Sequence, residues 1–402
     1  MTRMLSSLTL AAPVLAAAAV TAYAASGTGA ERPRSDGFAA ELLSHWCDGT
    51  ANLVFSPHSL AAAMGMVAAG GRGETSGQIA ACLGMGAVGS LPARFAALDG
   101  ALSAAKQAEG IELSVANSLW PQQDFVFRQD YMDLLRTQFR ADAQPVDYVT
   151  RSEPARQTIN RWVADRTANR IRDLIAPGVL GAATRMTLVN AVYFKGKWLH
   201  PFDPALTAEG QFFAPGGAVP VKFMKGKAKF RYAEADGIQA LELPYVGRKL
   251  SMLVLLPEKG RGVRHAVDNL HGSGASIWNT SLMEREVNVR LPKFSFVCER
   301  SCVETFKKLG VIDVFDAGRA DLSGMAGRPG DLVLSAILHK AFVEVGEAGT
   351  EAAAATAGVV SLTAFVPPQP PVTFHADHPF VFLIREHDTG CILFMGAVAQ
   401  PE

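Results

Sequence analysis

Apolar residues in this chain recur at spacings that predict both helices and strands. Ser59–Ala69 is alanine-rich and almost wholly apolar, which is typical of a buried helix. Thr187–Phe194 is a β-branched and apolar run of strand length, and Glu286–Leu291 alternates strictly between polar and apolar residues. Leu250–Leu256 is continuously apolar and ends at Pro257, so we predict a strand buried on both faces.

The C-terminal part of the chain predicts a hairpin. Phe380–Ile384 and Ile392–Val398 are two strand-like runs joined by a turn around His387–Gly390. Strands and helices are interspersed along the chain without a regular strand–helix–strand rhythm. This arrangement predicts the α+β class.

Gly346–Pro371 is the most informative segment. It begins with the charged stretch Glu347–Glu351, continues with small uncharged residues and ends rich in proline, which predicts an exposed loop. Between Thr350 and Leu362 it has no proline and no charge except Glu351. Such a segment can also become a central strand, where proline and buried charges are excluded. The loop therefore indicates a conformational switch, and an alanine-rich linker is the alternative.

Seven motifs besides the loop, and the start of the loop itself, are similar to those of the serpin family. Phe55–Leu60 resembles the family's FSPxS helix start, with Ser56 as N-cap and Pro57 at the first helical position. Leu188–Trp198 resembles LVNAxYFKGxW, and the loop start resembles the serpin hinge, Glu-x-Gly-Thr-Glu followed by alanines. The remaining matches are Gly70–Thr75, Leu291–Phe294, His339–Ala341, Ala376–Phe380 and Leu393–Gly396.

The resemblance implies one large α+β domain over residues 36–401, although length alone would suggest two or three domains. A serpin fold has three β-sheets, about eight or nine helices and an exposed reactive loop, here about residues 347–373. We therefore expect a single domain that carries the loop as its site.

The resemblance also assigns three groups of site residues. The hinge comprises Glu347, Ala348, Gly349, Thr350, Glu351, Ala352, Ala353, Ala354 and Ala355. The shutter, a buried hydrogen-bond cluster beneath the main sheet, comprises Ser56, Ser59, Asn190 and His339. The breach, where the loop first enters the sheet, comprises Trp198 and Lys293, and Lys293 is expected to pair with Glu347.

The implied function is inhibition of serine proteases by a suicide-substrate mechanism. The protease cleaves the loop, the loop inserts into the central sheet, and the covalent acyl-enzyme is trapped. Counting seventeen residues from Glu347, the usual family spacing, places the reactive bond between Thr363 and Ala364. Leu362, Ala364 or Phe365 could also precede the bond. A small β-branched residue there fits elastase-like or subtilisin-like proteases and does not fit trypsin-like ones.

Two other functions are alternatives. A non-inhibitory serpin acting as a binder, carrier or chaperone would tend to have charged, bulky or proline residues in the hinge, whereas this chain has only alanine from Ala352 to Ala355. A hydrolase has no motif in its favour, because G-x-S-x-G, a Walker loop and H-E-x-x-H do not occur. The sequence therefore predicts an inhibitor and not an enzyme.

The N-terminus predicts secretion. Residues 1–24 have a short basic start, an apolar alanine-rich core and a small-x-small end, which is typical of a signal peptide. A membrane anchor is the alternative, although Pro13 interrupts the apolar stretch. Residues 25–35 are expected to form a flexible segment. We therefore expect a secreted, extracellular protein.

Charge and ligand chemistry limit the partners. The chain has 38 basic and 38 acidic residues, and the region of the serpin heparin helix has only Arg94 and Lys106, so nucleic acid and heparin are not expected partners. Five scattered cysteines do not suggest a disulfide-stapled fold. His375–His378 could suggest a metal site, but a turn before a strand is favoured. We expect no cofactor, no metal, and a monomer that binds a serine protease covalently.

Overall fold

A six-stranded sheet contains the start of the hinge. The computed structural model describes residues 36–105, 107–271, 278, 281–350 and 370–401. The strand order in this sheet is β10-β11-β12-β4-β2-β3. The strands are β10 (Phe294–Ser301), β11 (Ala336–Gly346), β12 (Gly349–Thr350), β4 (Met186–Lys197), β2 (Ile111–Pro121) and β3 (Asp142–Ala143).

The two central strands of this sheet meet along only part of their length. β11 and β4 pair in parallel from Ala336↔Thr187 to Phe342↔Tyr193. Beyond this point β12 lies between them and pairs antiparallel with both. The sheet is therefore closed along the seam between β4 and β11, and it is open at one end, where the hinge has entered.

The second sheet has nine strands. They are β1 (Leu53–Phe55), β15 (Ile392–Val398), β14 (Phe380–Glu386), β8 (Leu250–Pro257), β7 (Ile238–Pro244), β6 (Gly217–Ala235), β9 (Met283–Pro292) and β13 (Val372–His375) in spatial order, with β5 (Ala208–Ala214) beside β6. Three sheets were expected. The 19-residue strand β6 joins two of them, because it pairs with β5 and β9 and, at its end, with β7.

The described residues contain eight α-helices. They are α1 (Asp36–Trp46), α2 (Pro57–Gly70), α3 (Gly73–Leu83), α4 (Leu91–Ala105), α5 (Gln129–Leu134), α6 (Tyr148–Arg166), α7 (Gly262–Asp268) and α9 (Val303–Lys308). Short 3-10 or π turns cover Val88–Ser90, Leu135–Phe139, Pro204–Leu206 and Asp313–Phe315. No single described helix is long and apolar enough to span a membrane, although the bent pair Gly73–Leu83 and Val88–Ala105 has the length and composition to do so.

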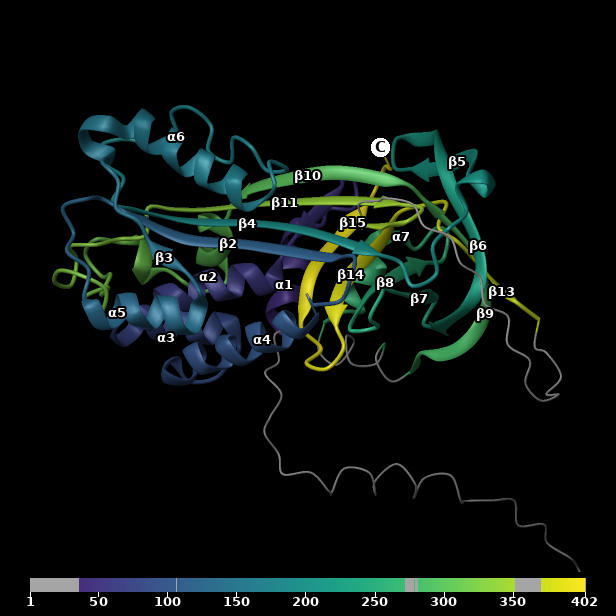
Figure 1. Cartoon of the computed structure of the whole chain (residues 1–402), viewed down its shortest axis with the longest axis horizontal. Helices are drawn as coiled ribbons and strands as arrows, with labels where there is room; N and C mark the ends of the chain where they lie inside the picture. The colour runs from purple at the N-terminus through teal and green to yellow at the C-terminus, as the bar shows by residue number, and fades with distance from the viewer. Residues whose placement is uncertain (1–35, 106, 272–277, 279–280, 351–369, 402) are drawn as a thin grey trace, which may run out of the picture. The chain divides into compact units, whose positions relative to one another are not determined.

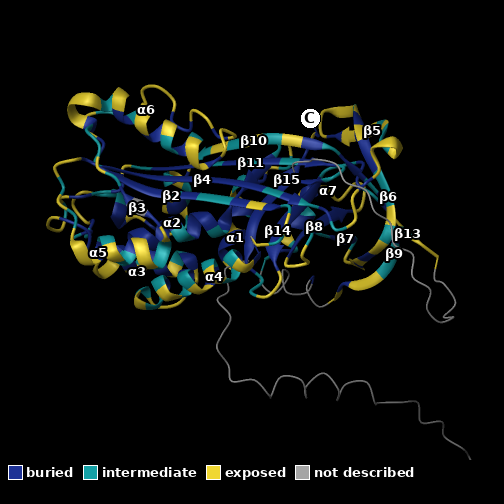
Figure 2. Cartoon of the chain, viewed as in Figure 1, coloured by how far each residue is buried: buried dark blue, intermediate teal, exposed yellow. Residues whose placement is uncertain are grey.

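The six-stranded sheet separates two apolar cores. In Figure 1, α6 lies over one face of this sheet and α2 lies on the other side. Leu188 and Val192 of β4 belong to the larger core, whereas Val189 and Ala191 belong to the smaller core beneath α6. Alternate residues of a strand point to opposite faces, so a strand covered on both sides is apolar throughout. In Figure 2, β4 is accordingly mostly dark blue, the colour of buried residues.

The local sequence patterns agree with these elements. The predicted helix Ser59–Ala69 lies within α2, and Ser56 caps α2 by accepting a hydrogen bond from the backbone N–H of Ser59. The hairpin prediction is confirmed by the antiparallel pair β14–β15. The α+β class is also confirmed, since helices and mainly antiparallel strands build one domain.

Candidate functional site

The first hinge residues already occupy a place in the sheet. Gly349 pairs with Gly346 of β11 and with Lys197 of β4, and Thr350 pairs with Val345 and Gly196. Gly349 has a φ of 154°, and a Cβ on it would collide with the carbonyl oxygen of Gly196. Only glycine fits this position, because the backbones of β12 and β4 approach closely there.

Trp198 and Phe202 hold the hinge backbone before β12. Nε1 of Trp198 donates to the carbonyl oxygen of Gly346 at 3.0 Å. The backbone N–H of Trp198 donates to the carbonyl oxygen of Ala348 at 2.9 Å. The backbone N–H of Phe202 donates to the carbonyl oxygen of Glu347 at 2.8 Å. The indole of Trp198 is buried, so the bond to Gly346 is protected from water.

Glu347 is fixed by two side chains from other strands and turns. Nζ of Lys293 lies 2.8 Å from one carboxylate oxygen, and the hydroxyl of Thr207 donates to the other at 2.9 Å. Burial alone would raise the pKa of Glu347, but the hydrogen bond from Lys293, with help from Thr207, brings the pKa below its usual value. Glu347 is therefore ionised at neutral pH and anchors the base of the hinge.

A buried aromatic group lies behind the docked hinge. The ring of Tyr245 stacks on Trp198 with centroids 4.5 Å apart and planes 13° apart, and it meets Phe194 edge-on at 5.1 Å. The phenol oxygen of Tyr245 lies 2.7 Å from the hydroxyl oxygen of Thr350. Thr350 is thus the first hinge residue whose side chain enters the core.

The predicted shutter residues lie together across the seam between β4 and β11. The amide of Asn190 on β4 donates to the hydroxyl of Ser59 and to Oδ1 of Asn117 on β2, and the Ser59 hydroxyl donates to Asn117 at 3.1 Å. Oδ1 of Asn190 contacts Nδ1 of His339 on β11, and Nε2 of His339 accepts from the backbone N–H of Ser56 at 3.2 Å. Every one of these residues is buried or nearly so.

This network fixes the protonation of His339. Since Nε2 accepts a hydrogen bond from an N–H, the proton of the neutral ring must lie on Nδ1, which donates to Asn190. Burial lowers the pKa of His339 to about 3, and the positive charge of Arg300 contributes to the same shift. His339 is therefore neutral at physiological pH and connects α2 to both central strands.

Four residues at these sites were missed from the sequence. They are Asn117, Phe202, Thr207 and Tyr245. None belongs to a motif used in the prediction, and each is separated by more than 50 residues from at least one site residue it contacts. All four are polar or aromatic residues. Residues of these types are too common in the chain for the sequence to single them out.

The remaining predicted site residues lie outside the described residues. They are Glu351, Ala352, Ala353, Ala354, Ala355 and the reactive-bond pair Thr363 and Ala364. The predicted signal peptide, residues 1–24, and the segment 25–35 also lie outside them.

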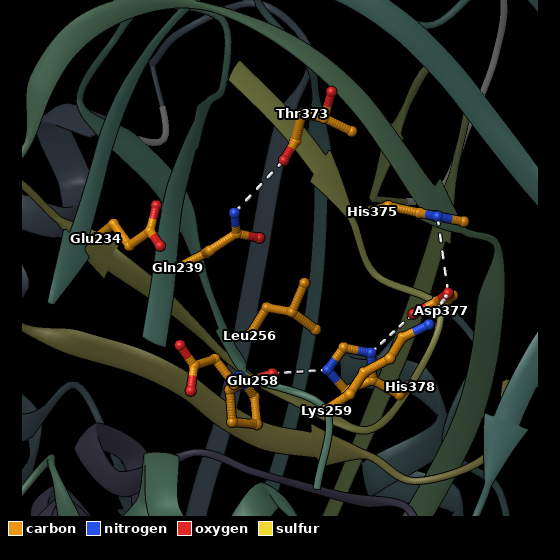
Figure 3. A pocket seen from close by; sticks show the side chains of 10 residues that line it. Glu234, Gln239, Leu256, Glu258, Lys259, Thr373, His375, Asp377 and His378 are labelled. Carbon is orange, nitrogen blue, oxygen red and sulfur yellow. Dashed lines mark hydrogen bonds and ion pairs between the residues drawn. The ribbon is translucent and has the colours of Figure 1, made fainter. Parts of the chain in front are cut away.

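The histidine cluster after the loop has the character of a turn. A pocket of about 290 Å³ beside β13 is lined in part by His375, Asp377 and His378 (Figure 3). Asp377 pairs with Lys259 at 2.7 Å, and His378 lies between Asp377, 2.8 Å from Nδ1, and the carbonyl oxygen of Pro257, 2.6 Å from Nε2. Within the described part of the chain no group of three acidic, histidine or cysteine side chains could hold a metal ion.

Curated relatives support protease inhibition. The human leukocyte elastase inhibitor is 37% identical over 359 residues, which cover 87% of this chain and 93% of that protein. The leukocyte elastase inhibitor of Xenopus tropicalis is 36% identical and covers 88% of this chain and 94% of its own length. The similarity therefore spans most of this chain and most of each relative.

These relatives also correct one expectation. The prediction of a secreted, extracellular protein is wrong, because the matching leukocyte elastase inhibitors belong to an intracellular group that lacks signal peptides. The prediction rested on the basic start, the apolar alanine-rich core and the small-x-small end of residues 1–24. Such a pattern near an N-terminus does not by itself determine export.

Family and structural matches agree. The family model described as serpin (serine protease inhibitor) matches residues 33–401. A solved structure of an Arabidopsis serpin in its native stressed conformation has a TM-score of 0.81 and 30% identity, and covers 91% of this chain and 96% of that one. The chain therefore belongs to the serpins, a family of serine protease inhibitors and not of enzymes.

Proposed function

We propose that the chain inhibits a serine protease by acting as a suicide substrate. The nucleophilic oxygen of the protease attacks the carbonyl carbon of Thr363, the bond to the nitrogen of Ala364 breaks, and an acyl-enzyme ester forms. The freed hinge then inserts between β4 and β11 and carries the tethered protease along the sheet. The protease is distorted before water can hydrolyse the ester, so a stable one-to-one complex remains.

The docked hinge is the observation that carries this proposal. Gly349 and Thr350 already pair antiparallel with both β4 and β11, in the orientation that a full inserted strand would have. From Ala352 to Leu362 the following residues have no charge and no proline. Continued insertion therefore buries no charged group and loses no backbone donor.

The energetics support an irreversible step. Insertion must separate the parallel pairs between Thr187 and Tyr193 of β4 and Ala336 and Phe342 of β11. It replaces one ladder with two, and each added hydrogen bond contributes about 0.5–1.5 kcal/mol net. A full strand then adds stabilisation comparable to the ~5–15 kcal/mol of an ordinary domain. The uncut chain is held by a kinetic barrier.

The target class follows from the residue before the bond. Thr363 is small and β-branched, which suits the narrow apolar primary pockets of elastase-like or subtilisin-like proteases. No lysine or arginine occurs between Glu351 and His375, so trypsin-like proteases lack a suitable residue. The relatives named as leukocyte elastase inhibitors support the elastase-like class.

The proposal is tested by incubating the purified chain with leukocyte elastase, subtilisin and trypsin. We expect a complex with elastase or subtilisin that resists denaturant, and a released C-terminal peptide that begins at Ala364. Thr350→Arg is the matched variant, because an arginine at this buried position blocks insertion and should turn the inhibitor into a substrate. Cleavage without any stable complex in the unmodified chain would overturn inhibition and favour a non-inhibitory binding role.

A further inference from the structure

The docked part of the hinge presents a hydroxyl to the core. Thr350 is 1% exposed and Tyr245 is fully buried, and their oxygens lie 2.7 Å apart. Each hydroxyl satisfies the other in a place that water does not reach. Removing either hydroxyl leaves the other without this partner. The equilibrium between the docked and the undocked hinge then shifts toward the undocked state by about tenfold or more.

The ring of Tyr245 is held rigidly beneath β12. It is stacked on Trp198 and packed edge-on against Phe194, and its backbone N–H donates to the carbonyl oxygen of Leu250 at 3.0 Å. Gly196, the β4 partner of Thr350, leaves space for it, since a Cβ there would come within 2.8 Å of the ring. The phenol therefore stays at one fixed position.

A fixed phenol distinguishes the correct register of the incoming strand from its neighbours. In a strand, a shift of one residue moves every side chain to the opposite face. A shift in one direction would present Gly349, which has no side chain, and a shift in the other would require burial of the carboxylate of Glu351. Among these three residues, Thr350 is the one that can bond to the phenol of Tyr245 without burying a charge.

We propose that Tyr245 is a positioning residue that keeps the hinge docked in the uncut chain and sets the register in which the strand inserts. This inference rests on the proposed inhibitory function. Because the first pairs of the new strand form before cleavage, later residues extend an existing strand and do not have to start one. Insertion is then fast relative to hydrolysis of the acyl-enzyme, and fewer inhibitor molecules are lost as cleaved substrate.

The test compares Tyr245→Phe, Thr350→Val, Thr350→Ser and the double variant Tyr245→Phe/Thr350→Val. The control is Tyr131→Phe, which removes a buried phenol that donates to the carbonyl oxygen of Met66 at 2.9 Å, outside the breach. Hydrogen exchange of the Gly349 and Thr350 amides reports docking in the uncut chain. The number of inhibitor molecules consumed per elastase molecule trapped reports insertion.

We expect Tyr245→Phe and Thr350→Val each to speed hydrogen exchange at the Gly349 and Thr350 amides by about tenfold. Each should also raise severalfold the number of inhibitor molecules consumed per elastase molecule trapped. Thr350→Ser and Tyr131→Phe should behave as the unmodified chain. The double variant should be no worse than either single variant, because no hydroxyl is then left without a partner. Unchanged exchange in Tyr245→Phe, or additive losses in the double variant, would overturn the proposal.

The two proposals fail in different ways. If the unmodified chain traps no protease, the inhibitory function fails, yet exchange still decides whether Tyr245 holds the hinge. If trapping occurs and Tyr245→Phe changes neither exchange nor consumption, only the positioning role fails. Melting temperatures of all variants separate both results from a general loss of folding.

Discussion

At the scale of single residues, the neutral state of His339 has a consequence for stability. Burial lowers its pKa to about 3, whereas an unfolded chain has the ordinary value near 6.5. Between these values the unfolded state binds a proton that the folded state does not. Stability is therefore fully present above about pH 6.5 and is lost as the pH falls toward 3.

We predict that the free energy of unfolding of the uncut chain falls by up to ~1.4 kcal/mol per pH unit from this histidine. Denaturant unfolding between pH 7.5 and 5 would measure it. His200, His375 and His387 also have lowered pKa values, mainly through burial, and act in the same direction. The variant His339→Gln isolates the contribution of His339 to this pH dependence. If the free energy of unfolding depends on pH as steeply in this variant as in the unmodified chain, His339 is not its source.

Gly349 carries a second prediction at the residue scale. A Cβ at this position collides with the backbone of β4, so Gly349→Ala should force β12 out of the sheet. The indole of Trp198 would then lose its bond to Gly346 and become more exposed, which a red shift of tryptophan emission would report. Gly216→Ala is the control, since a Cβ there meets nothing within 4 Å. Equal spectra for both variants would argue against the docked hinge.

At the scale of elements, the seam between β4 and β11 is the part that must open. Asn190 and His339 are paired residues across this seam, and their side chains bond to each other and to α2 through Ser56 and Ser59. A buried network stabilises an arrangement only while all its members are satisfied. The shutter therefore controls how readily the two strands separate.

His339→Ala should lower the barrier to opening this seam. The variant leaves Oδ1 of Asn190 and the backbone N–H of Ser56 without their partner, at a cost of about 1–3 kcal/mol each. On mild warming we expect polymers or a latent monomer with an inserted loop, visible on native gels. His45→Ala, at an exposed position on α1, is the control. A stable native monomer for both variants would count against this role.

At the scale of the whole molecule, the uncut chain is expected to be metastable. Cutting the loop near Thr363 with a non-target protease should raise the melting temperature by tens of degrees, because the inserted strand adds two ladders to the sheet. Thermal melts before and after cutting measure the change. The same cut in Thr350→Arg should give little increase, and an equal melting point in the unmodified chain would favour a non-inhibitory serpin.

Features that depend on neighbouring residues could be predicted from the amino-acid sequence. Apolar periodicity located α2, β4 and the β14–β15 hairpin, and the Ser-Pro pair fixed the start of α2. The small residues after Glu347 indicated a loop able to become a strand. These properties are local, because helix starts, turns and strand faces depend on residues a few positions apart.

Contacts between groups far apart in the chain became visible in the folded structure alone. Asn117 joins the shutter because the β2–β4 register places it opposite Asn190. Tyr245 contacts Thr350 because the fold brings β12 next to the residue that follows β7. The joining of two expected sheets through β6 was likewise invisible in its local pattern. A shift of one residue in any of these pairings would move each side chain to the other face, and no short stretch of sequence specifies a register between strands so far apart in the chain.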